Sequence, residues 1–271
     1  MRSITVIGSV NMDFVVVGDR LPREGETVLG RTFAASPGGK GANQAVAATL
    51  LGARVRLVGC VGEDQHGRWL RTHLRQCRVG VQGLRTVRGT TGVAVIMVDR
   101  RGRNLISVAP GANQRVRPHG THDIAVLQLE TPYMRPRARL VILNPAPARP
   151  VSLRGVDVVI PNEIEARQLT GHSDPARATR ALVRMGAKRV LITLGGRGVY
   201  DGALRRRRPA FRVNVVDSVG AGDTFVGAFA AALARDHPDP VRFAQAAAAL
   251  KCTRRGAQNG PTCADVERFL S

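Results

Sequence analysis

The sequence has few aromatic residues, almost no lysine and no long run of charge. Aromatic residues make up 4% of 271 positions, and only three of the 41 basic residues are lysines. Proteins that bind single-stranded nucleic acid stack bases on aromatic side chains, so this lack argues against that function in spite of a net charge of +21. The only tight basic run is Arg205 to Arg208, in an expected loop. We therefore expect no nucleic-acid partner, but a solvated basic surface that attracts anionic substrates.

Paired-cysteine motifs and membrane-spanning runs are also missing. Cys60, Cys77, Cys252 and Cys263 form no CxxC pair and no metal-binding spacing with the six histidines, so we expect reduced thiols. The N-terminus, MRSITVIGSV, runs directly into an apolar strand without a signal peptide, and no apolar run is long enough to cross a bilayer. The sequence thus predicts a cytoplasmic protein with no membrane attachment.

Strand-like and helix-like segments alternate along most of the chain. With 44% hydrophobic residues, the pattern predicts a single α/β domain over residues 1–271 with a doubly wound, mostly parallel sheet flanked by helices. Two stretches, at about 14–35 and 92–108, alternate apolar and polar residues between turn residues and predict a small separate β-sheet. Two connections, 111–123 and 131–139, are short and contain proline, so one or two crossover helices are expected to be missing. We expect part of one sheet face to be exposed there or covered by a partner subunit.

The stretch Val215–Leu233 carries the main chemical signal. A β-rich run at 211–216 meets the turn Gly220-Ala221-Gly222, and an apolar helical segment opens at Asp223. Free N–H groups at a helix start bind anions, and glycine lets the anion approach the backbone. Asp223 could accept a proton from a substrate hydroxyl while these N–H groups face a phosphoryl group in transfer. The alternative is an aspartate that merely caps its helix.

Two further polar groups lie at expected strand and helix ends. Asn11 and Asp13 follow the first strand, and on extended backbone both side chains point the same way. An amide beside a carboxylate suits a polyhydroxylated ligand, although both residues are also common in turns. The loop 36–43 leads into an Ala-rich helix, but it is not a Walker A loop, because Gly41 follows Lys40. It offers bare backbone, a cation and an amide, and its alternative is a hairpin end with one surface lysine.

Eight motifs together resemble the PfkB family of sugar kinases, to which the ribokinases belong. In chain order they are GSVNMD (8–13), GGKGANQAVAA (38–48), QLE (128–130), NPAPA (144–148), PNEIEA (161–166), LITLGGRGV (191–199), VDSVGAGDTFVGAF (216–229) and RFAQAAAA (242–249). They span nearly the whole chain. The resemblance implies an ATP-dependent kinase that phosphorylates the 5-hydroxyl of D-ribose, giving ribose 5-phosphate and ADP. Deoxyribose or another small furanose, or a non-catalytic sugar-binding or regulatory relative, remain as alternatives.

The resemblance also implies a role for each matching residue. It makes Asp223 the catalytic base beside an anion hole formed by the amides of Gly220, Ala221 and Gly222. The positions implied to bind the sugar are Asn11, Asp13, Gly38, Gly39, Lys40, Asn43, Glu130 and Asp223. Those implied to bind the nucleotide are Asn162, Thr193, Leu194, Gly195, Gly196, Arg197, Gly198, Gly222 and Gln245.

Cofactors and partners follow from the same resemblance. Glu165 belongs to the motif that organises Mg²⁺ through water. The positions matching a monovalent-cation loop are Asp217, Val219, Lys251, Arg254, Gly256 and Gly260. Lys251 stands where the family has a small residue, so potassium is doubtful and we expect weak activation by monovalent cations. The small sheet corresponds to a lid through which two subunits form a homodimer.

Overall fold

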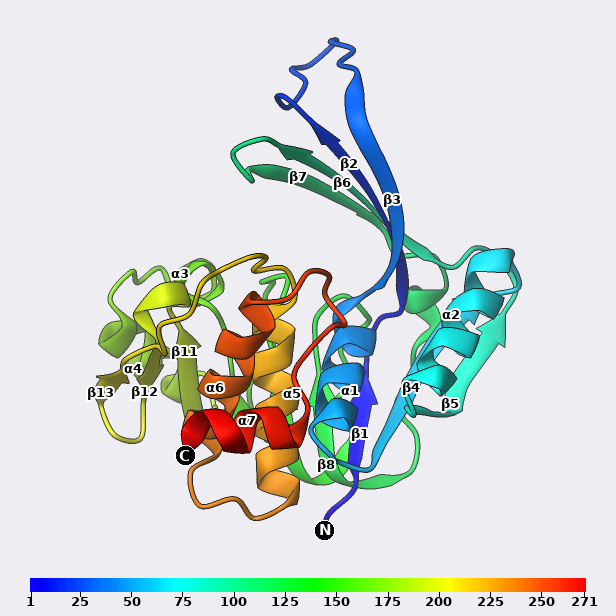
Figure 1. Ribbon diagram of the computed structural model, residues 1–271. Helices are drawn as coiled ribbons and strands as arrows, with labels where there is room; N and C mark the ends of the chain where they lie inside the picture. The colour runs from blue at the N-terminus through cyan, green and yellow to red at the C-terminus, as the bar shows by residue number, and fades with distance from the viewer.

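The computed structural model describes residues 1–271, which form a nine-stranded sheet and a separate four-stranded sheet (Figure 1). The strand order in the large sheet is β13-β12-β11-β10-β9-β8-β1-β4-β5, and only β12 and β13 run antiparallel to their neighbours. The strands are β1 (Ile4–Ile7), β4 (Val55–Gly62), β5 (Gly80–Val87), β8 (Thr121–Leu127), β9 (Arg137–Leu143), β10 (Val158–Val159), β11 (Arg189–Thr193), β12 (Val199–Asp201) and β13 (Arg206–Arg208). The predicted doubly wound, mostly parallel sheet is confirmed.

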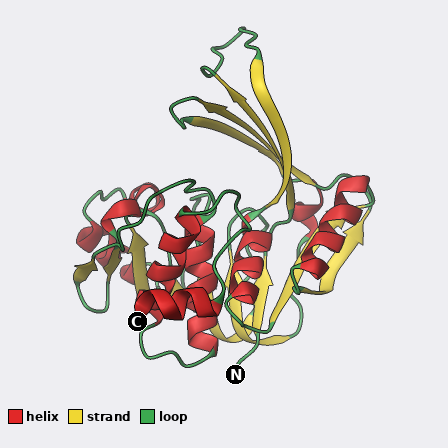
Figure 2. Ribbon diagram, viewed as in Figure 1, coloured by secondary structure: helices red, strands yellow, loops and turns green.

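Helices cover both faces of this sheet (Figure 2). They are α1 (Lys40–Leu50), α2 (Gln65–Gln76), α3 (Glu163–Thr170), α4 (Pro175–Arg184), α5 (Ala221–Ala234), α6 (Pro240–Cys252) and α7 (Cys263–Leu270), with short 3₁₀ turns η1 (Gly111–Arg115) and η2 (Gly195–Arg197). One core joins the sheet to α1, α2, α5, α6 and α7, and a second joins its other face to α3 and α4. None of these helices combines the length and apolar character that a membrane span requires.

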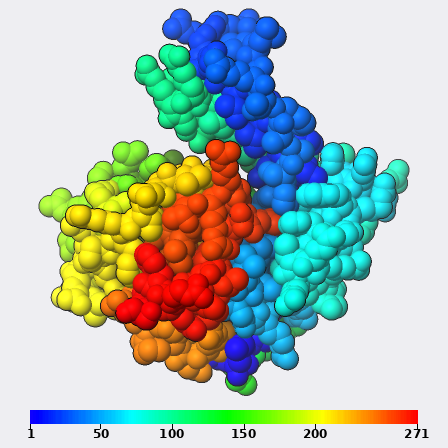
Figure 3. Space-filling view, in the orientation of Figure 1, coloured from blue at the N-terminus to red at the C-terminus, as the bar shows by residue number.

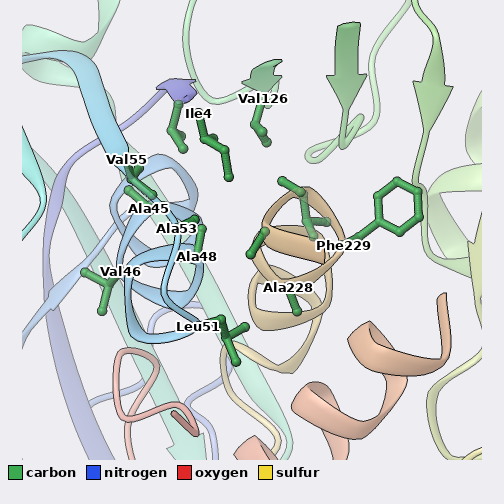
Figure 4. Close-up of a cluster of buried hydrophobic side chains, with 14 of the residues drawn as sticks. Ile4, Ala45, Val46, Ala48, Leu51, Ala53, Val55, Val126, Ala228 and Phe229 are labelled. Carbon is green, nitrogen blue, oxygen red and sulfur yellow. The ribbon is translucent and has the colours of Figure 1, made fainter. Parts of the chain in front are cut away.

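Alanine-rich helices pack closely where α1 meets α5 (Figure 4). Ala45 and Ala48 of α1 and Ala228 of α5 are fully buried beside Ile4 of β1. A Cβ added to Gly227 would lie 2.6 Å from Gln44 O and 2.9 Å from Ala47 Cβ, so only glycine fits at this crossing. The close approach brings the N-terminal turns of α1 and α5 together, which is where the predicted site residues lie.

The four-stranded sheet, called the small sheet below, projects from the body of the molecule (Figure 3). Its order is β3 (Gly30–Gly38), β2 (Asn11–Gly18), β6 (Gly92–Asp99) and β7 (Asn104–Ala109). The β2–β6 pair is parallel, and the other two pairs are antiparallel. Because β2 follows β1 directly and β3 leads directly into α1, both ends of the β2–β3 hairpin are anchored at the carboxyl edge of the large sheet.

Crossover helices are absent at three connections. No helix lies between β8 and β9 or between β9 and β10, and η1 alone precedes β8. The expectation of an exposed sheet face at this place was wrong, however. Leu127 and Leu143 on that face are almost fully buried, because Leu153 and Val156 of the β9–β10 connection pack in their core. Apolar loop residues thus replace the missing helices.

Two further expectations were wrong around residue 210. The β-rich run at 211–216 is not a strand, because no neighbouring strand offers it a ladder partner. Conversely, Arg206–Arg208, expected in a loop, forms β13 and pairs with β12 at the edge of the large sheet. α5 also opens at Ala221, two residues before Asp223.

Candidate active site

The start of α5 presents free backbone amides at one point. Gly220 precedes the helix in a left-handed conformation, with φ of 76°. The N–H of Ala221 donates to Ser218 O (3.1 Å), whereas those of Gly222 and Asp223 have no backbone acceptor. Such donors at the positive end of a helix are suited to an anion. Of the three predicted anion-hole residues, Ala221 therefore has its N–H already in use, and Asp223 adds a donor that the sequence did not indicate.

The carboxylate of Asp223 is held by side chains of α1 and does not cap α5. Asn43 Nδ2 donates to Asp223 Oδ2 (2.9 Å), and Gln44 Nε2 donates to Asp223 Oδ1 (2.9 Å). The residue is 8% exposed. Each oxygen keeps a lone pair beyond these bonds, so a buried, oriented carboxylate can still accept a proton from a bound hydroxyl.

The glycine-rich turn before α1 brings its side chains against the ends of β1 and β2. Gly39 has φ of 86°, and a Cβ at that position would lie 2.8 Å from Asn11 N. A Cβ added to Gly38 would lie 2.0 Å from the Asp13 carboxylate. Only glycine allows this approach, and it places Lys40 within the same polar cluster as Asp13.

Polar side chains from four segments converge beside Asp223. Asn11 Oδ1 accepts a hydrogen bond from Asn113 Nδ2 (2.7 Å), which fixes the orientation of the Asn11 amide. Glu130 Oε2 accepts from the N–H of Lys40 (3.1 Å). Asp13 Oδ1 is buried and has no hydrogen-bond partner in the protein. A buried acceptor without a partner indicates a place where a ligand donor binds, and hydroxyl groups supply such donors.

The charges in this cluster shift the ionisation of several groups. Burial, together with the nearby Glu130 and Asp223 carboxylates, raises the pKa of Asp13 to about 7, against the opposing effect of Lys40. The charge of Asp223 raises the pKa of the Lys40 ammonium, which therefore stays protonated near neutral pH. Burial also raises the pKa of Glu165. The cluster thus holds more carboxylates than cations and accommodates donors, such as sugar hydroxyls, more readily than anions.

A cleft of about 880 Å³ opens on the other side of the α5 start. Gly222 lines it, together with Arg207 of β13, Phe211 and Phe225. The predicted nucleotide-binding residues that line it are Thr193, Gly195, Gly196, Arg197, Gly198, Gly222 and Gln245. A Cβ added at Gly195 or Gly196 would meet no atom within 4 Å, so this turn offers open backbone. The volume of the cleft suits a nucleotide.

Two predicted nucleotide-binding residues do not line this cleft. Leu194 is buried in the core. Asn162 caps α3 and forms a bridge with Thr193, so it supports the cleft from behind. Gln245 lines the cleft, but its amide already donates to Pro209 O (2.9 Å) and so also fixes the segment that follows β13.

Glu165 forms a capping box with Asn162. Its Oε2 accepts from Asn162 N (2.8 Å) and its Oε1 from Asn162 Nδ2 (2.9 Å). Since each oxygen keeps one lone pair, the carboxylate suits the water shell of a cation better than direct ligation. No group of three or more His, Cys, Asp or Glu side chains forms a candidate metal site.

The predicted cation loop is organised around a lysine. Lys251 is fully buried, and its Nζ donates to the backbone oxygens of Asp217 (3.2 Å) and Arg254 (3.0 Å). Asp217 Oδ1 accepts from Val219 N (2.9 Å), and Asp217 Oδ2 accepts from Gly256 N (2.8 Å). The ammonium therefore lies between two loops, one of which leads directly into the α5 start. Gly260, the remaining predicted residue, offers its carbonyl to Arg254 Nη1 (2.7 Å).

Several residues of the site were not predicted from the sequence. Gln44 and Asn113 hold Asp223 and Asn11, and Gln258 contacts Asn43. A signal was present for Gln44, because it is an amide in a buried helix segment whose other residues, apart from Asn43, are glycine, alanine and valine. Asn113 lies in the short turn η1 and Gln258 in the loop between α6 and α7; neither segment has a periodic pattern, and only the fold brings them to the site.

The fold and the site together define a phosphotransferase that acts on a sugar hydroxyl. A buried carboxylate and free helix amides lie between a polar cluster suited to hydroxyl groups and a cleft of nucleotide size. The chain belongs to the pfkB family of carbohydrate kinases, and it matches the profile of that family over residues 1–263.

Relatives named as sugar kinases match the chain over nearly its full length. The ribokinase of Bacillus subtilis is 39% identical, with 100% of both chains covered. The deoxyribokinase of Salmonella typhi is 33% identical and covers 99% of this chain and 98% of its own. Two solved structures are also similar: ribokinase from Thermotoga maritima (TM-score 0.87, 33% identity, 100% and 99% covered) and Arabidopsis thaliana ribokinase complexed with ribose and ATP (0.84, 31%, 100% and 99%).

Proposed function

We propose that this protein transfers the terminal phosphoryl group of ATP to the 5-hydroxyl of D-ribose, giving ribose 5-phosphate and ADP. The observation that carries the proposal is the position of Asp223, whose carboxylate adjoins the polar cluster while the free amide beside it, at Gly222, opens into the cleft. Full-length relatives named ribokinase and a similar structure complexed with ribose and ATP support this choice of substrates.

In the proposed reaction the polar cluster holds the sugar. Asn11, Asp13, Lys40, Asn43 and Glu130 bind its hydroxyl groups, with Gly38 and Gly39 giving them room. Asp223 accepts the proton as the sugar oxygen attacks the terminal phosphorus and the bond to ADP breaks. The N–H groups of Gly222 and Asp223 stabilise the charge on the transferring phosphoryl oxygens.

The nucleotide is proposed to lie in the cleft, with its phosphates toward the α5 start. Mg²⁺ bound with ATP would neutralise phosphate charge, and Glu165 fits a water-mediated role in holding it. The Lys251 ammonium already donates to the carbonyls of Asp217 and Arg254, and this supports a site that does not depend on potassium.

The small sheet is proposed to act as the lid of a single-domain enzyme, and its exposed apolar side chains support a homodimer formed through it. Both ends of its β2–β3 hairpin adjoin the sugar cluster, so movement of the lid would exclude water from the sugar. A cytoplasmic location, where ATP is available, belongs to the same proposal.

A second candidate substrate is deoxyribose, because the Salmonella typhi relative carries that name. The two sugars differ by one hydroxyl, and a site built to bind a hydroxyl strongly disfavours a ligand that lacks it. The ratio of kcat/KM for the two sugars therefore identifies the better substrate.

The test is a coupled ADP-release assay over a panel of pentoses and hexoses. We expect ribose-dependent release, reduced at least about 100-fold in Asp223→Asn, because loss of a general base costs about 10²–10⁴-fold. Asp236→Asn, at an exposed carboxylate, is the matched control and should keep full activity. Absence of release with every sugar would support a non-catalytic sugar-binding relative instead.

A further inference from the structure

A chain of hydrogen bonds runs from the surface helix α2 to the carboxylate of Asp223. His73 Nε2 lies 2.8 Å from Gln258 Oε1, Gln258 Nε2 donates to Asn43 Oδ1 (2.9 Å), and Asn43 Nδ2 donates to Asp223. The residues come from α2, from the loop between α6 and α7, from α1 and from α5. Figure 1 shows that loop reaching the start of α1.

All donors in this chain point in the same direction. Gln258 Oε1 can only accept, so His73 carries a proton on Nε2 and donates it. Each amide then accepts on its oxygen and donates from its nitrogen toward Asp223. Bonds aligned in this way polarise one another and strengthen the last one. Protonation of His73 at its other nitrogen leaves the Nε2 donor in place, so the hydrogen-bond chain is the same in either charge state of the ring.

The hydrogen-bond chain fixes which way the Asn43 amide is turned. An amide turned by 180° would present its oxygen to the Asp223 carboxylate, which is repulsive. The N–H of Gln258 removes this option, because it needs the Asn43 oxygen on its own side. On the other carboxylate oxygen, Gln44 is oriented in the same manner by Gln128 Nε2, which donates to Gln44 Oε1 (2.6 Å).

The residues that orient Gln44 and those that orient Asn43 differ in their exposure to solvent. Gln44 and Gln128 are fully buried in the protein core, whereas Gln258 and His73 are only partly buried. Trp69 stacks on His73 with ring centroids 5.4 Å apart and an angle of 6°, and Cys77 Sγ lies 3.5 Å from His73 Nε2. The His73 ring is therefore held in place, and the orientation of Asn43 is set from the molecular surface.

We infer that Gln258 and His73 are positioning residues that keep the Asn43 amide, and through it the Asp223 carboxylate, in the orientation that accepts the sugar proton. The inference rests on the proposed function, since it assigns Asp223 the role of base. In these contacts each residue reaches Asp223 only through its neighbour.

Loss of this hydrogen-bond chain has a definite effect on the reaction step. An Asn43 amide that is free to turn no longer holds the Asp223 carboxylate in one orientation, so kcat, measured at saturating sugar, should fall. Asn43 does not line the nucleotide-sized cleft, so KM for ATP should not change.

The experiment compares Gln258→Leu, Gln258→Glu and His73→Phe with the exposed control Gln76→Leu. Leucine removes both bonds, and glutamate keeps the shape but cannot donate to Asn43. Phenylalanine keeps the ring against Trp69 without its N–H. We expect kcat to fall about 3-fold to 10-fold in both Gln258 variants and less in His73→Phe, with KM for ATP unchanged. Gln76→Leu should match the wild type.

A double variant separates positioning from a general structural effect. In an Asn43→Ala background, Gln258→Leu should cause no further loss of kcat, because its target is gone. Additive losses, or a Gln258→Leu enzyme with the kcat of the wild type, would overturn the inference. A wild type that releases no ADP with any sugar would instead contradict the proposed function, so the two failures are distinguishable.

Discussion

Asp13 is the site residue whose environment least suits a charge. Its Oδ1 is buried without a partner, Gly38 packs against its carboxylate, and burial together with two other carboxylates raises its pKa to about 7. Sugar hydroxyls that donate to it would favour its charged form. Binding of the sugar should therefore release a proton from Asp13 near neutral pH. A role in accepting hydrogen bonds from sugar hydroxyls best explains why this carboxylate lies in an unfavourable environment.

We expect kcat/KM for ribose to fall about tenfold for each pH unit below about 7, because the free enzyme must then lose the Asp13 proton before the sugar binds. The value of kcat should change less, since the bound sugar stabilises the carboxylate. Asp13→Asn should have a low kcat/KM without this limb. Steady-state kinetics from pH 5.5 to 8.5 test this prediction. If kcat/KM of Asp13→Asn falls at low pH as it does in the wild type, a group other than Asp13 is responsible for the fall.

The same shift predicts how stability depends on pH. The pKa of Asp13 in the folded protein lies above the ordinary value of 3.8, so the folded protein binds more protons between these values. The contribution of this group to stability is complete below 3.8 and is lost as the pH rises to about 7. Asp13→Asn should therefore raise Tm at pH 8 and change it little at pH 4, as scanning calorimetry can measure. Equal changes at both pH values would contradict the linkage.

Lys251 leads to a prediction about salt. Its ammonium is buried between the carbonyls of Asp217 and Arg254, and burial lowers its pKa. Added potassium should change the wild-type rate by less than about twofold, because that position is filled. Lys251→Ala should lose about tenfold in kcat and regain part of it with KCl or ammonium chloride. Strong potassium activation of the wild type would refute this account.

At the scale of elements, motifs and periodicity predicted the helices well, because local signals mark the helix starts. A capping side chain begins α2, α3, α4, α6 and α7, and a glycine turn precedes α1 and α5. The run at 211–216 misled, since β-propensity is effective only beside a partner strand. The short strands β12 and β13 were missed because three residues carry no periodic signal. The exposed sheet face was predicted wrongly because loop residues such as Leu153 take the place of a helix.

Leu153 should therefore matter as much as a core helix residue. It is fully buried in the connection between β9 and β10, and Leu153→Ala should lower the free energy of unfolding by about 2–4 kcal/mol. Urea unfolding followed by circular dichroism measures this. Leu204→Ala, at an exposed leucine in the β12–β13 turn, should cost less than about 0.5 kcal/mol. A small effect at Leu153 would mean that the loops do not stabilise the sheet.

At the scale of the whole molecule, the sequence predicted Asp223, Asn43 and the glycine turns because each belongs to a contiguous motif at a helix start. It did not predict Gln258 or His73, which lie 185 positions apart and meet only through the fold. The small sheet was predicted from the alternation of apolar and polar residues alone. The register of its strands shows in addition which residues share a face, which the pattern could not. Asp13 pairs with Ala94, and Ala94 pairs with Val108, so the face that carries Asp13 continues across β2, β6 and β7.

That face favours the proposed dimer. The next row on it joins Val15 to Ile96 and Ile96 to Ile106, and Ile106 is 57% exposed although apolar. A second copy of the small sheet packed there would cover this row and close the sugar cluster from above.

We therefore expect the wild type to be a dimer in sedimentation velocity, and Ile106→Lys to be a monomer with a raised KM for ribose, because a buried lysine without a partner opposes association. Leu105→Lys is the matched control: it is 51% exposed on the same strand but points to the opposite face, and it should remain dimeric. Dissociation by Leu105→Lys alone would move the interface to the other face. A monomeric wild type at micromolar concentration would contradict the dimer itself.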